Sequence, residues 1–395
     1  MTSSTFLERL GRVTSSGRLI PQIDGLRFVA ISTVIIFHLA GVVEATSPVS
    51  WSVAPSNTVV GSLAAQGHYG VELFFAISGF ILAMPFAKCR LGTGRRPRLG
   101  AYYLRRLTRL EPPYILSLLL LFVLQLLNGR HFWPHARHLL ASLVYQHNLV
   151  FGAASAVNAV AWSLEVEVQF YLLAPALGLI YAVRDRARRR GLLVAIWAAS
   201  ILFKAVWLSP PAALAIPGPT LINYFEFFWI GFILADLFVV EEWEGATPSR
   251  WWDLVSVVGW PLLMMAWLDQ RLTAVAFPAL VALLYTAALR GKVSGKVFSN
   301  RWLVVVGGMC YTLYLFHLAI IAGLARFTRH LVLTDRFDVN VAVQLTILGP
   351  VVLVLSAIFF VLVERPCMRP DWPRQLADWA RIHINPRSVA RGQAK

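Results

Sequence analysis

Residues 23–39 read IDGLRFVAISTVIIFHL, and this stretch decides the fold of the chain. With its flanks it is apolar and long enough to cross a bilayer, yet it carries Arg27 near one end and His38 well inside. Both side chains are costly to place in lipid, so each is a candidate functional group. At about 100° per residue, Arg27 and His38 return to nearly the same helix face, roughly 16 Å apart along the axis.

The composition predicts an all-α integral membrane protein. Hydrophobic residues make up 57% of the 395 residues and charged residues 14%, and the mean hydropathy is +0.63. These values exclude an ordinary water-soluble domain. Because a spanning helix needs about 20 mostly apolar residues, we expect a bundle of about ten transmembrane helices. The windows are 20–43, 68–87, 110–128, 162–183, 191–208, 220–240, 252–268, 272–290, 303–325 and 342–363.

The basic residues set the expected orientation. With a cytoplasmic N-terminus, the inner segments hold 28 of the 36 Lys and Arg residues and the outer loops hold 6. This positive-inside pattern predicts that both termini are cytoplasmic and that the chain is a multi-pass protein of the inner (cytoplasmic) membrane. The net charge of +16 is therefore a topology signal, and we expect no nucleic-acid partner.

The composition divides the chain into three parts. Residues 1–19 form a polar, basic cytoplasmic lead-in, without the apolar core or cleavage site of a signal peptide. Residues 20–366 form the ten-helix membrane domain. Residues 367–395 form a basic cytoplasmic tail, in which 371–384 is expected to lie on the membrane as an amphipathic helix. We expect no appended soluble catalytic domain, and the three cysteines indicate neither a disulfide framework nor a metal site.

The most basic stretch, 88–109, precedes the third window. Attraction to anionic membrane lipid explains most of its charges. Arg106 and Arg109 differ, because an i,i+3 pair at the start of a helix presents two guanidinium groups on one side. Such a pair can hold phosphates.

Carboxylates enter two further windows. Glu72 lies in the stretch GVELFFAISGF at 70–80, where a glutamate reaching to interfacial water explains it as well as chemistry does. Glu165 and Glu167 open the fourth window, and two residues apart they face different ways on a helix. At least one of them is therefore expected to point into the protein.

Other polar residues have ordinary explanations. Lys204 is expected to extend to the membrane interface, and helix–helix hydrogen bonding explains Glu226 and Asp236 as well as chemistry does. The outer segment 129–161 carries four histidines whose spacing matches no metal site, so solvated or interfacial side chains are expected. These histidines are His131, His135, His138 and His147.

The ninth window carries a polar stripe, since Tyr311, Tyr314 and His317 recur at intervals of three on an apolar helix. In the predicted topology, the ionisable groups lie at two depths in the membrane. Arginines suit anionic phosphates, and histidine suits proton transfer near neutral pH. A substrate that joins the two zones needs phosphates at one end and a reactive group at the other, and acyl-coenzyme A has that shape. The inner group is Arg27, Arg105, Arg106, Arg109 and Arg365, and the outer group is His38, Glu72, Glu167 and His317.

The same residues resemble the motifs of the membrane acyltransferase-3 family. The resemblance runs from residue 24 to residue 366, and several motifs in the right order make it specific. The motifs are Asp24-Gly25-Leu26-Arg27 with His38, Gly70-Val71-Glu72-Leu73-Phe74-Phe75, Ser78-Gly79-Phe80, Tyr103-Leu104-Arg105-Arg106 with Arg109, Trp162-Ser163-Leu164 with Glu167, Gln169-Phe170-Tyr171-Leu172, Tyr311-Thr312-Leu313-Tyr314-Leu315 with His317, and Glu364-Arg365-Pro366.

The resemblance implies a ten-helix acyltransferase domain at 20–366 that moves acyl groups, commonly acetyl, from acyl-CoA to hydroxyls of carbohydrates or glycosylated natural products. It implies that Arg27 and His38 are essential and that Arg106 and Arg109 serve donor binding. The chain departs from the usual pattern at four places, and these departures concern the acceptor more than the reaction type. They are Glu72 in place of Asp, Glu165 in place of a small residue, Val168 in place of a second acid, and the pair Pro112-Pro113 in place of one proline.

These considerations predict direct acyl transfer with His38 as general base. Glu72 or Glu167 would orient the imidazole or hold acceptor hydroxyls, while His317 and Tyr314 would position the thioester or polarise its carbonyl. We predict that Tyr314 binds the donor together with Arg27, Arg106 and Arg109. We expect acyl-CoA, acetyl-CoA above all, as the donor, membrane lipid as the surroundings, and no resident cofactor or metal.

The acceptor and the acyl chain length stay open at this point. A surface polysaccharide, a lipid-linked sugar and a macrolide or other glycoside are all compatible with the sequence. The alternative from another class is a proton-coupled secondary transporter, in which the buried His and Glu would relay protons. The internal repeats common in transporters are absent from the sequence. A structural scaffold would leave the intramembrane arginine and acids unexplained.

Overall fold

The computed structural model describes residues 10–13, 19–92, 94–207, 219–241, 243, 247–268, 270–369, 372–373 and 375, and within them it contains helices and no β-strand. A helix lies over each of the ten predicted windows. The helices are α2 (Pro21–Thr46), α3 (Val59–Ala65), α4 (Gly70–Leu91), α5 (Leu99–Leu127), α6 (Phe132–Leu143), α7 (His147–Phe151), α8 (Trp162–Leu177), α9 (Arg186–Trp207), α10 (Phe225–Val240), α11 (Arg250–Leu268), α12 (Gln270–Arg290), α13 (Val293–Phe298), α14 (Arg301–Gly308), α15 (Cys310–Thr328), α16 (Phe337–Phe359), a π-helical turn (Phe360–Glu364) and α17 (Arg365–Cys367).

Helix length and apolarity support a multi-pass membrane protein. Within the described part of the chain, six segments are long and apolar enough to cross a membrane. Helix α5 starts well before its predicted window, because the basic stretch continues the same helix. The amphipathic helix predicted for 371–384 lies largely outside the described residues. The six segments are Pro21–Thr46, Val59–Leu91, Leu99–Leu127, Ala159–Ala182, Cys310–Thr328 and Phe337–Cys367.

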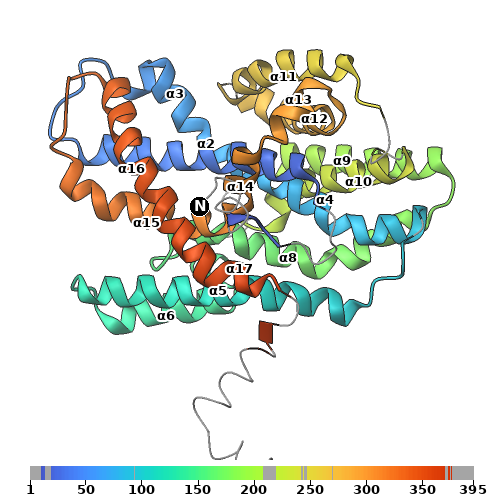
Figure 1. Ribbon diagram of the computed structural model, residues 1–395, viewed down its shortest axis with the longest axis horizontal. Coiled ribbons are helices and arrows are strands. Elements are labelled where there is room, and N and C mark those ends of the chain that lie inside the picture. Colours follow the sequence, from blue (N-terminus) through green and yellow to red (C-terminus); the bar gives the residue numbers. More distant parts are fainter. Residues whose placement is uncertain are drawn as a thin grey trace, which may run out of the picture.

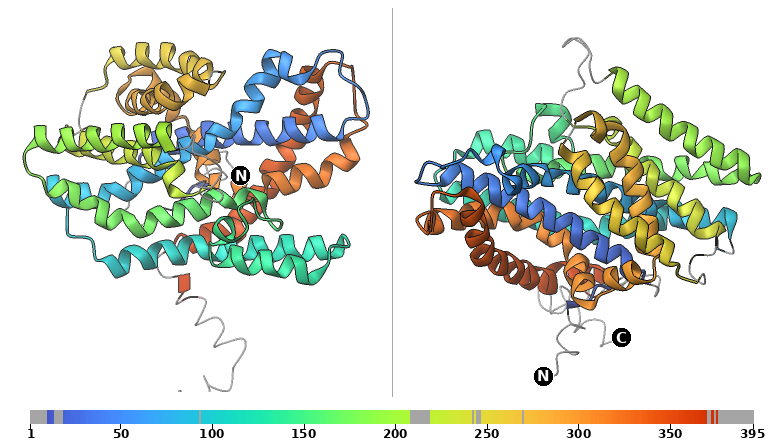
Figure 2. Two further views of the ribbon diagram at one scale, coloured as in Figure 1. Left: turned by 180° about the vertical axis from the view of Figure 1, so that it is seen from behind. Right: turned by 90° about the horizontal axis from the view of Figure 1, so that it is seen from above.

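Helix α2 lies at the centre of the bundle. It packs against α4, α14, α15 and α16. Figure 1 shows it crossing the middle of the molecule, with α11, α12 and α13 grouped along one edge and α5 with α6 along the opposite edge. The view from behind in Figure 2 keeps the same arrangement. Residues of the central helix therefore meet partners from both halves of the sequence.

The predicted ninth helix, 303–325, is two helices, because the chain turns at Met309 between α14 and α15. Just before the turn, Gly307 brings α14 into backbone contact with α2. A Cβ at Gly307 would lie 1.7 Å from the carbonyl oxygen of Asp24, so only glycine lets α14 cross α2 this closely. The turn sets the direction of α15, which carries the stripe Tyr311, Tyr314 and His317.

Helices α4 and α10 are in backbone contact. A Cβ at Gly79 would lie 2.0 Å from the carbonyl oxygen of Phe228, and one at Gly231 would lie 2.1 Å from the amide nitrogen of Phe80. Small residues at such crossings are typical of membrane helix pairs, where close van der Waals packing drives association. Gly79 of the SGF motif therefore serves packing, and it fixes α4 beside the cavity described below.

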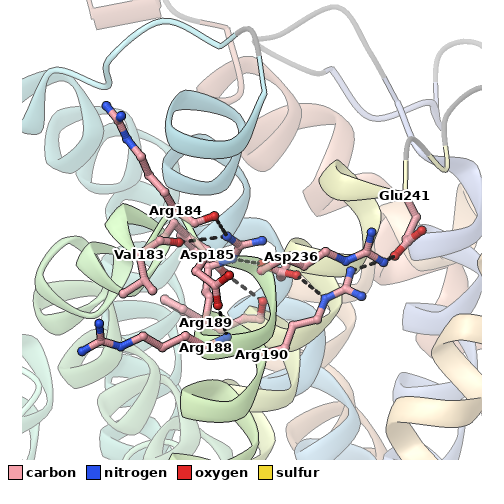
Figure 3. Close-up of polar contacts among 11 residues, drawn as sticks. Val183, Arg184, Asp185, Arg188, Arg189, Arg190, Asp236 and Glu241 are labelled. Carbon is pink, nitrogen blue, oxygen red and sulfur yellow. Dashed lines mark hydrogen bonds and ion pairs between the residues drawn. The ribbon is translucent and has the colours of Figure 1, made fainter.

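Two buried acids of α10 form ion pairs. Asp236 of α10 accepts from Arg189 Nε at 2.5 Å and from Arg190 Nε at 3.0 Å, and both basic residues come from α9 (Figure 3). Glu226 accepts from Lys204 Nζ at 2.6 Å. Lys204, which was expected to extend to the interface, is 28% exposed and pairs with this buried carboxylate on the neighbouring helix.

Two of the four histidines of the segment 129–161 bond to each other. His138 Nδ1 and His147 Nε2 lie 2.7 Å apart, joining α6 to α7. Burial lowers the pKa of both rings; the charges of His135 and Arg137 add to the effect at His138, and that of His138 adds to it at His147. The described residues hold no cluster of three metal-ligating side chains.

Candidate active site

A cavity of about 790 Å³ lies between α2, α4, α5, α8 and α15. All four predicted donor-binding residues, Arg27, Arg106, Arg109 and Tyr314, line it. The charges on its wall are predominantly positive, which favours an anionic ligand. The basic lining residues are Arg12, Arg27, Lys88, Arg105, Arg106 and Arg109, and the acidic ones are Asp24, Glu167 and Glu364.

Asp24 joins two arginines at the basic end of the cavity. Its Oδ1 accepts from Arg27 Nη1 at 2.6 Å and from Arg12 Nη1 at 2.8 Å, and the carboxylate is 1% exposed. Arg27 therefore has two roles available, because it pairs with an acid on its own helix and also faces the cavity. The sequence placed Arg27 here but gave no signal for Arg12, which lies upstream of every motif.

Arg106 and Arg109 of α5 occupy the same wall. The Arg106 guanidinium stacks over the ring of Tyr102, 4.1 Å from its centroid, and lies 5.8 Å from that of Tyr171. Stacking on aromatic faces holds the planar group while leaving N–H donors at its edge for an anion. Arg109 has a buried Nε with no hydrogen-bond partner among the described residues. The helical i,i+3 spacing thus brings two guanidinium groups to one cavity.

Glu364 is held by the turn of α15. Its Oε2 accepts from the backbone N–H of Thr312 at 3.1 Å and from Thr312 Oγ1 at 2.5 Å. The carboxylate is 2% exposed and belongs to the π-helical turn. The motif residues at 311–315 and 364–366 therefore meet, although about 50 residues separate them in sequence.

Hydroxyl groups and a carboxylate also line the cavity. Ser78 Oγ donates to Glu167 Oε1 at 2.5 Å. The Tyr314 hydroxyl donates to the Val160 carbonyl at 2.9 Å and lies 2.7 Å from Ser163 Oγ. Because its one proton goes to the carbonyl, Tyr314 has none left to polarise a thioester in this arrangement.

His38 and His317 lie beside each other, with ring centroids 5.1 Å apart. His317 Nδ1 lies 3.0 Å and 2.9 Å from the carbonyl oxygens of Leu313 and Tyr314, so it must carry the proton. The fully buried Nε2 of His317 has no partner among the described residues and keeps a lone pair. His38 is half-buried. Neither histidine lines the cavity, but the ring of Tyr314, which does, lies 5.9 Å from that of His317.

The remaining acids of the motifs separate in space. Glu72 is buried outside the cavity lining, with an unpartnered Oε2, near the Lys204–Glu226 pair. Glu165 is 1% exposed and accepts from the backbone N–H of Asn148 at 2.7 Å. Of the predicted catalytic carboxylates, the structure brings only Glu167 into the cavity. Sequence reasoning missed Glu364 and Asp24 as site residues, although both stand in quoted motifs.

Comparison with known proteins agrees with this geometry. A family model described as an acyltransferase domain, acyltransferase-3, matches residues 20–363. The chain belongs to the acyltransferase-3 family. The match spans all eight predicted site residues, from Arg27 to His317, and most of the cavity lining. Arg12 lies before the matched residues, and Glu364 directly follows them.

Curated relatives of this acyltransferase-3 chain have names that refer to O-acetylation. It is 25% identical over 334 residues to "Putative O-acetyltransferase SACOL0978" of Staphylococcus aureus (strain COL), which covers 77% of this chain and 51% of the relative. It is 25% identical over 338 residues to "Peptidoglycan O-acetyltransferase OatA" of Listeria monocytogenes, covering 78% of this chain and 50% of the relative. The chain thus spans about half the length of these relatives. No solved structure matches the chain.

Proposed function

We propose that this protein is a membrane O-acyltransferase that moves an acyl group, acetyl by analogy with its relatives, from acyl-CoA to a hydroxyl of a carbohydrate or glycoside. One observation carries the proposal. Arg27, Arg106, Arg109 and Tyr314 line a single, predominantly basic cavity, and the ring of Tyr314 lies 5.9 Å from that of His317, which lies beside His38. Bidentate guanidinium groups suit the phosphates of coenzyme A, and the imidazoles suit proton transfer.

The reaction that we propose is direct transfer. A ring nitrogen of His38 takes the proton of the acceptor hydroxyl, and the oxygen attacks the thioester carbonyl carbon. The carbon–sulfur bond breaks, coenzyme A leaves as a thiolate, and the proton on His38 passes to that thiolate. No covalent acyl-enzyme is required.

His317 has a positioning role in this scheme. Its ring lies 5.1 Å from that of His38, and its Nε2 is a hydrogen-bond acceptor without a partner among the described residues. An N–H of His38 directed at that acceptor leaves the other His38 nitrogen unprotonated and able to act as a base. Because neutral His317 has no free donor, this role replaces the polarisation of the carbonyl that the sequence suggested.

Glu167 is the carboxylate that we assign to the acceptor. It lines the cavity, and its bond to Ser78 leaves acceptor capacity for sugar hydroxyls. Glu72 lies outside the lining and has the weaker claim to such a role. The sugar itself stays open among a surface polysaccharide, a lipid-linked sugar and a secreted glycoside. The name of the Listeria relative makes peptidoglycan a candidate.

The membrane arrangement belongs to the same proposal. We infer ten spans with both termini in the cytoplasm of an inner-membrane protein, with 20–366 as the catalytic domain. The positive-inside distribution of Lys and Arg supports this orientation. It places the basic end of the cavity toward the cytoplasm, where acyl-CoA is available.

The test is thiol release from acetyl-CoA by purified protein, with a panel of peptidoglycan fragments and other glycosides as acceptors. His38→Ala is expected to lower kcat by a factor of about 10² to 10⁴, the usual contribution of a general base. His131→Ala, at an exposed ring away from the cavity, is the matched control. Near-normal turnover of His38→Ala would refute the assignment.

A transporter makes the opposite prediction. Uptake of a solute into proteoliposomes, coupled to protons and without release of coenzyme A, would favour it. The family of the chain and the names of its relatives favour the transferase.

A further inference from the structure

Residues 10–13 precede the matched domain and pack against the cavity. Leu10 and Val13 lie on the main hydrophobic core, and the carbonyl oxygen of Gly11 accepts from Arg365 Nε at 3.1 Å. These residues of the predicted lead-in therefore pack against the membrane domain. Apolar anchors on both sides hold Arg12 at the basic end of the cavity.

Arg12 is in contact with the site at several atoms. Its Nη1 shares Asp24 Oδ1 with Arg27, and its side chain is 13% exposed. Its Nε is buried without a partner among the described residues. The Arg12 side chain lines the cavity beside Gly308, where an added Cβ would lie 3.4 Å from that of Arg12. A brace for Asp24 would account for one of these contacts but not for the unpartnered donor.

The arginines around Asp24 outnumber the acids beside them, so Asp24 does not need Arg12 as its counter-ion. Asp24 already has Arg27 at 2.6 Å, so a second guanidinium on the same oxygen leaves one positive charge unpaired. Arg12 and Arg109 are also close enough for their charges to interact. Glu364 is close enough for its charge to act on both, so Arg12, Arg27 and Arg109 stand beside two carboxylates, Asp24 and Glu364. One positive charge remains, and an anionic ligand would neutralise it.

We propose that Arg12 is a donor-binding residue, which acts with Arg109 to bind a phosphate group of the acyl-CoA nucleotide. This inference rests on the proposed function, because it names the same donor. It assigns part of the donor site to a segment outside the matched domain. Arg27 then holds Asp24 in place, while Arg12 supplies the free N–H donors that a phosphate needs.

The experiment measures coenzyme A binding by calorimetry and the kinetics of acetyl-CoA, using the full chain in detergent. Arg12→Gln is expected to weaken coenzyme A binding and raise KM for acetyl-CoA about tenfold, with kcat changed less. Arg12→Lys should fall between, because it keeps the charge but loses the planar fork. Arg301→Gln, at an exposed position off the cavity, is the control and should match the wild type.

Acetyl-pantetheine distinguishes a contact between Arg12 and a donor phosphate from structural support of the site, because it carries the thioester without the nucleotide. If Arg12 binds a phosphate, Arg12→Gln and the wild type use acetyl-pantetheine equally well. Equal impairment with both donors would overturn the inference in favour of a structural brace. Thermal unfolding of each variant shows whether it folds, and Arg12→Lys provides the comparison if Arg12→Gln does not.

The outcomes also separate the two proposals. Wild-type binding of coenzyme A with unchanged binding by Arg12→Gln would overturn the role of Arg12 and leave the proposed function standing. A wild-type protein that neither binds coenzyme A nor releases thiol would overturn both.

Discussion

Replacing Asp236 with Asn should destabilise the fold by about 3 kcal/mol. Asp236 is 1% exposed and Arg189 is 3% exposed, so the change leaves a buried guanidinium without its counter-ion. Breaking a buried pair from one side typically costs 3–5 kcal/mol. We use the lower end of this range for two reasons. Arg189 Nη1 also donates to the Val183 carbonyl at 2.9 Å, and the Arg190 side chain, which is 27% exposed, can bind water.

The assay is thermal unfolding of the purified protein, followed by tryptophan fluorescence. Glu241→Gln is the matched control, since Glu241 bonds to Arg186 and Arg190 in the same cluster but is 36% exposed (Figure 3). Exposed pairs are typically worth less than about 1 kcal/mol. The melting temperature of Asp236→Asn should therefore fall clearly below that of Glu241→Gln.

A double variant tests the physical reason. Arg189→Met with Asp236→Leu removes both buried charges and should recover most of the lost stability, since apolar side chains often replace a buried pair without loss. The reasoning is refuted if Asp236→Asn and Glu241→Gln melt at the same temperature. It is also refuted if the double variant is the least stable of the set.

Two further predictions concern the histidines. His317→Ala should lower kcat about tenfold or more while KM for acetyl-CoA stays near the wild-type value, because the residue orients His38 and touches no donor phosphate; parallel changes in KM would contradict this role, and steady-state kinetics with thiol detection measures both. The His138–His147 bond requires at least one neutral ring, and burial lowers the pKa of both. The stability that the bond contributes is therefore present above the ordinary histidine pKa and is lost as the pH falls from about 7.5 to about 5. Thermal unfolding across this range should show a smaller fall for His147→Gln than for the wild type, and an equal fall would refute it.

Local pattern was enough to place most of the helices. Apolar length predicted a helix at each of ten windows, and helical spacing predicted that Arg106 and Arg109 share one face, as they do in the cavity. Both depend on neighbours in sequence, whose geometry the helix itself fixes. The sequence did not predict the break between α14 and α15 at Met309, which follows the close contact of Gly307 with α2.

The roles of the buried acids could not be predicted in this way. The sequence made Glu72 and Glu167 catalytic candidates and left Glu226 and Asp236 open, yet of these four only Glu167 lines the cavity, while Glu226 and Asp236 pair with basic residues of α9. An ionisable residue in an apolar window needs a polar or charged partner, but the sequence of that window does not predict which residue it is. That choice follows from contacts between distant segments.

The sequence by itself determined the class of the protein, its helices and the residue types of its site. Composition and hydrophobic periodicity depend only on the chain and its solvent, so the class and the helices can be predicted from them without knowledge of the packing. The tertiary structure alone decided that Arg12 reaches Asp24, that Tyr314 bonds Ser163 and that the rings of His317 and His38 lie 5.1 Å apart. Such contacts depend on which helix faces lie together, because a side chain can bond only the groups that packing brings within reach.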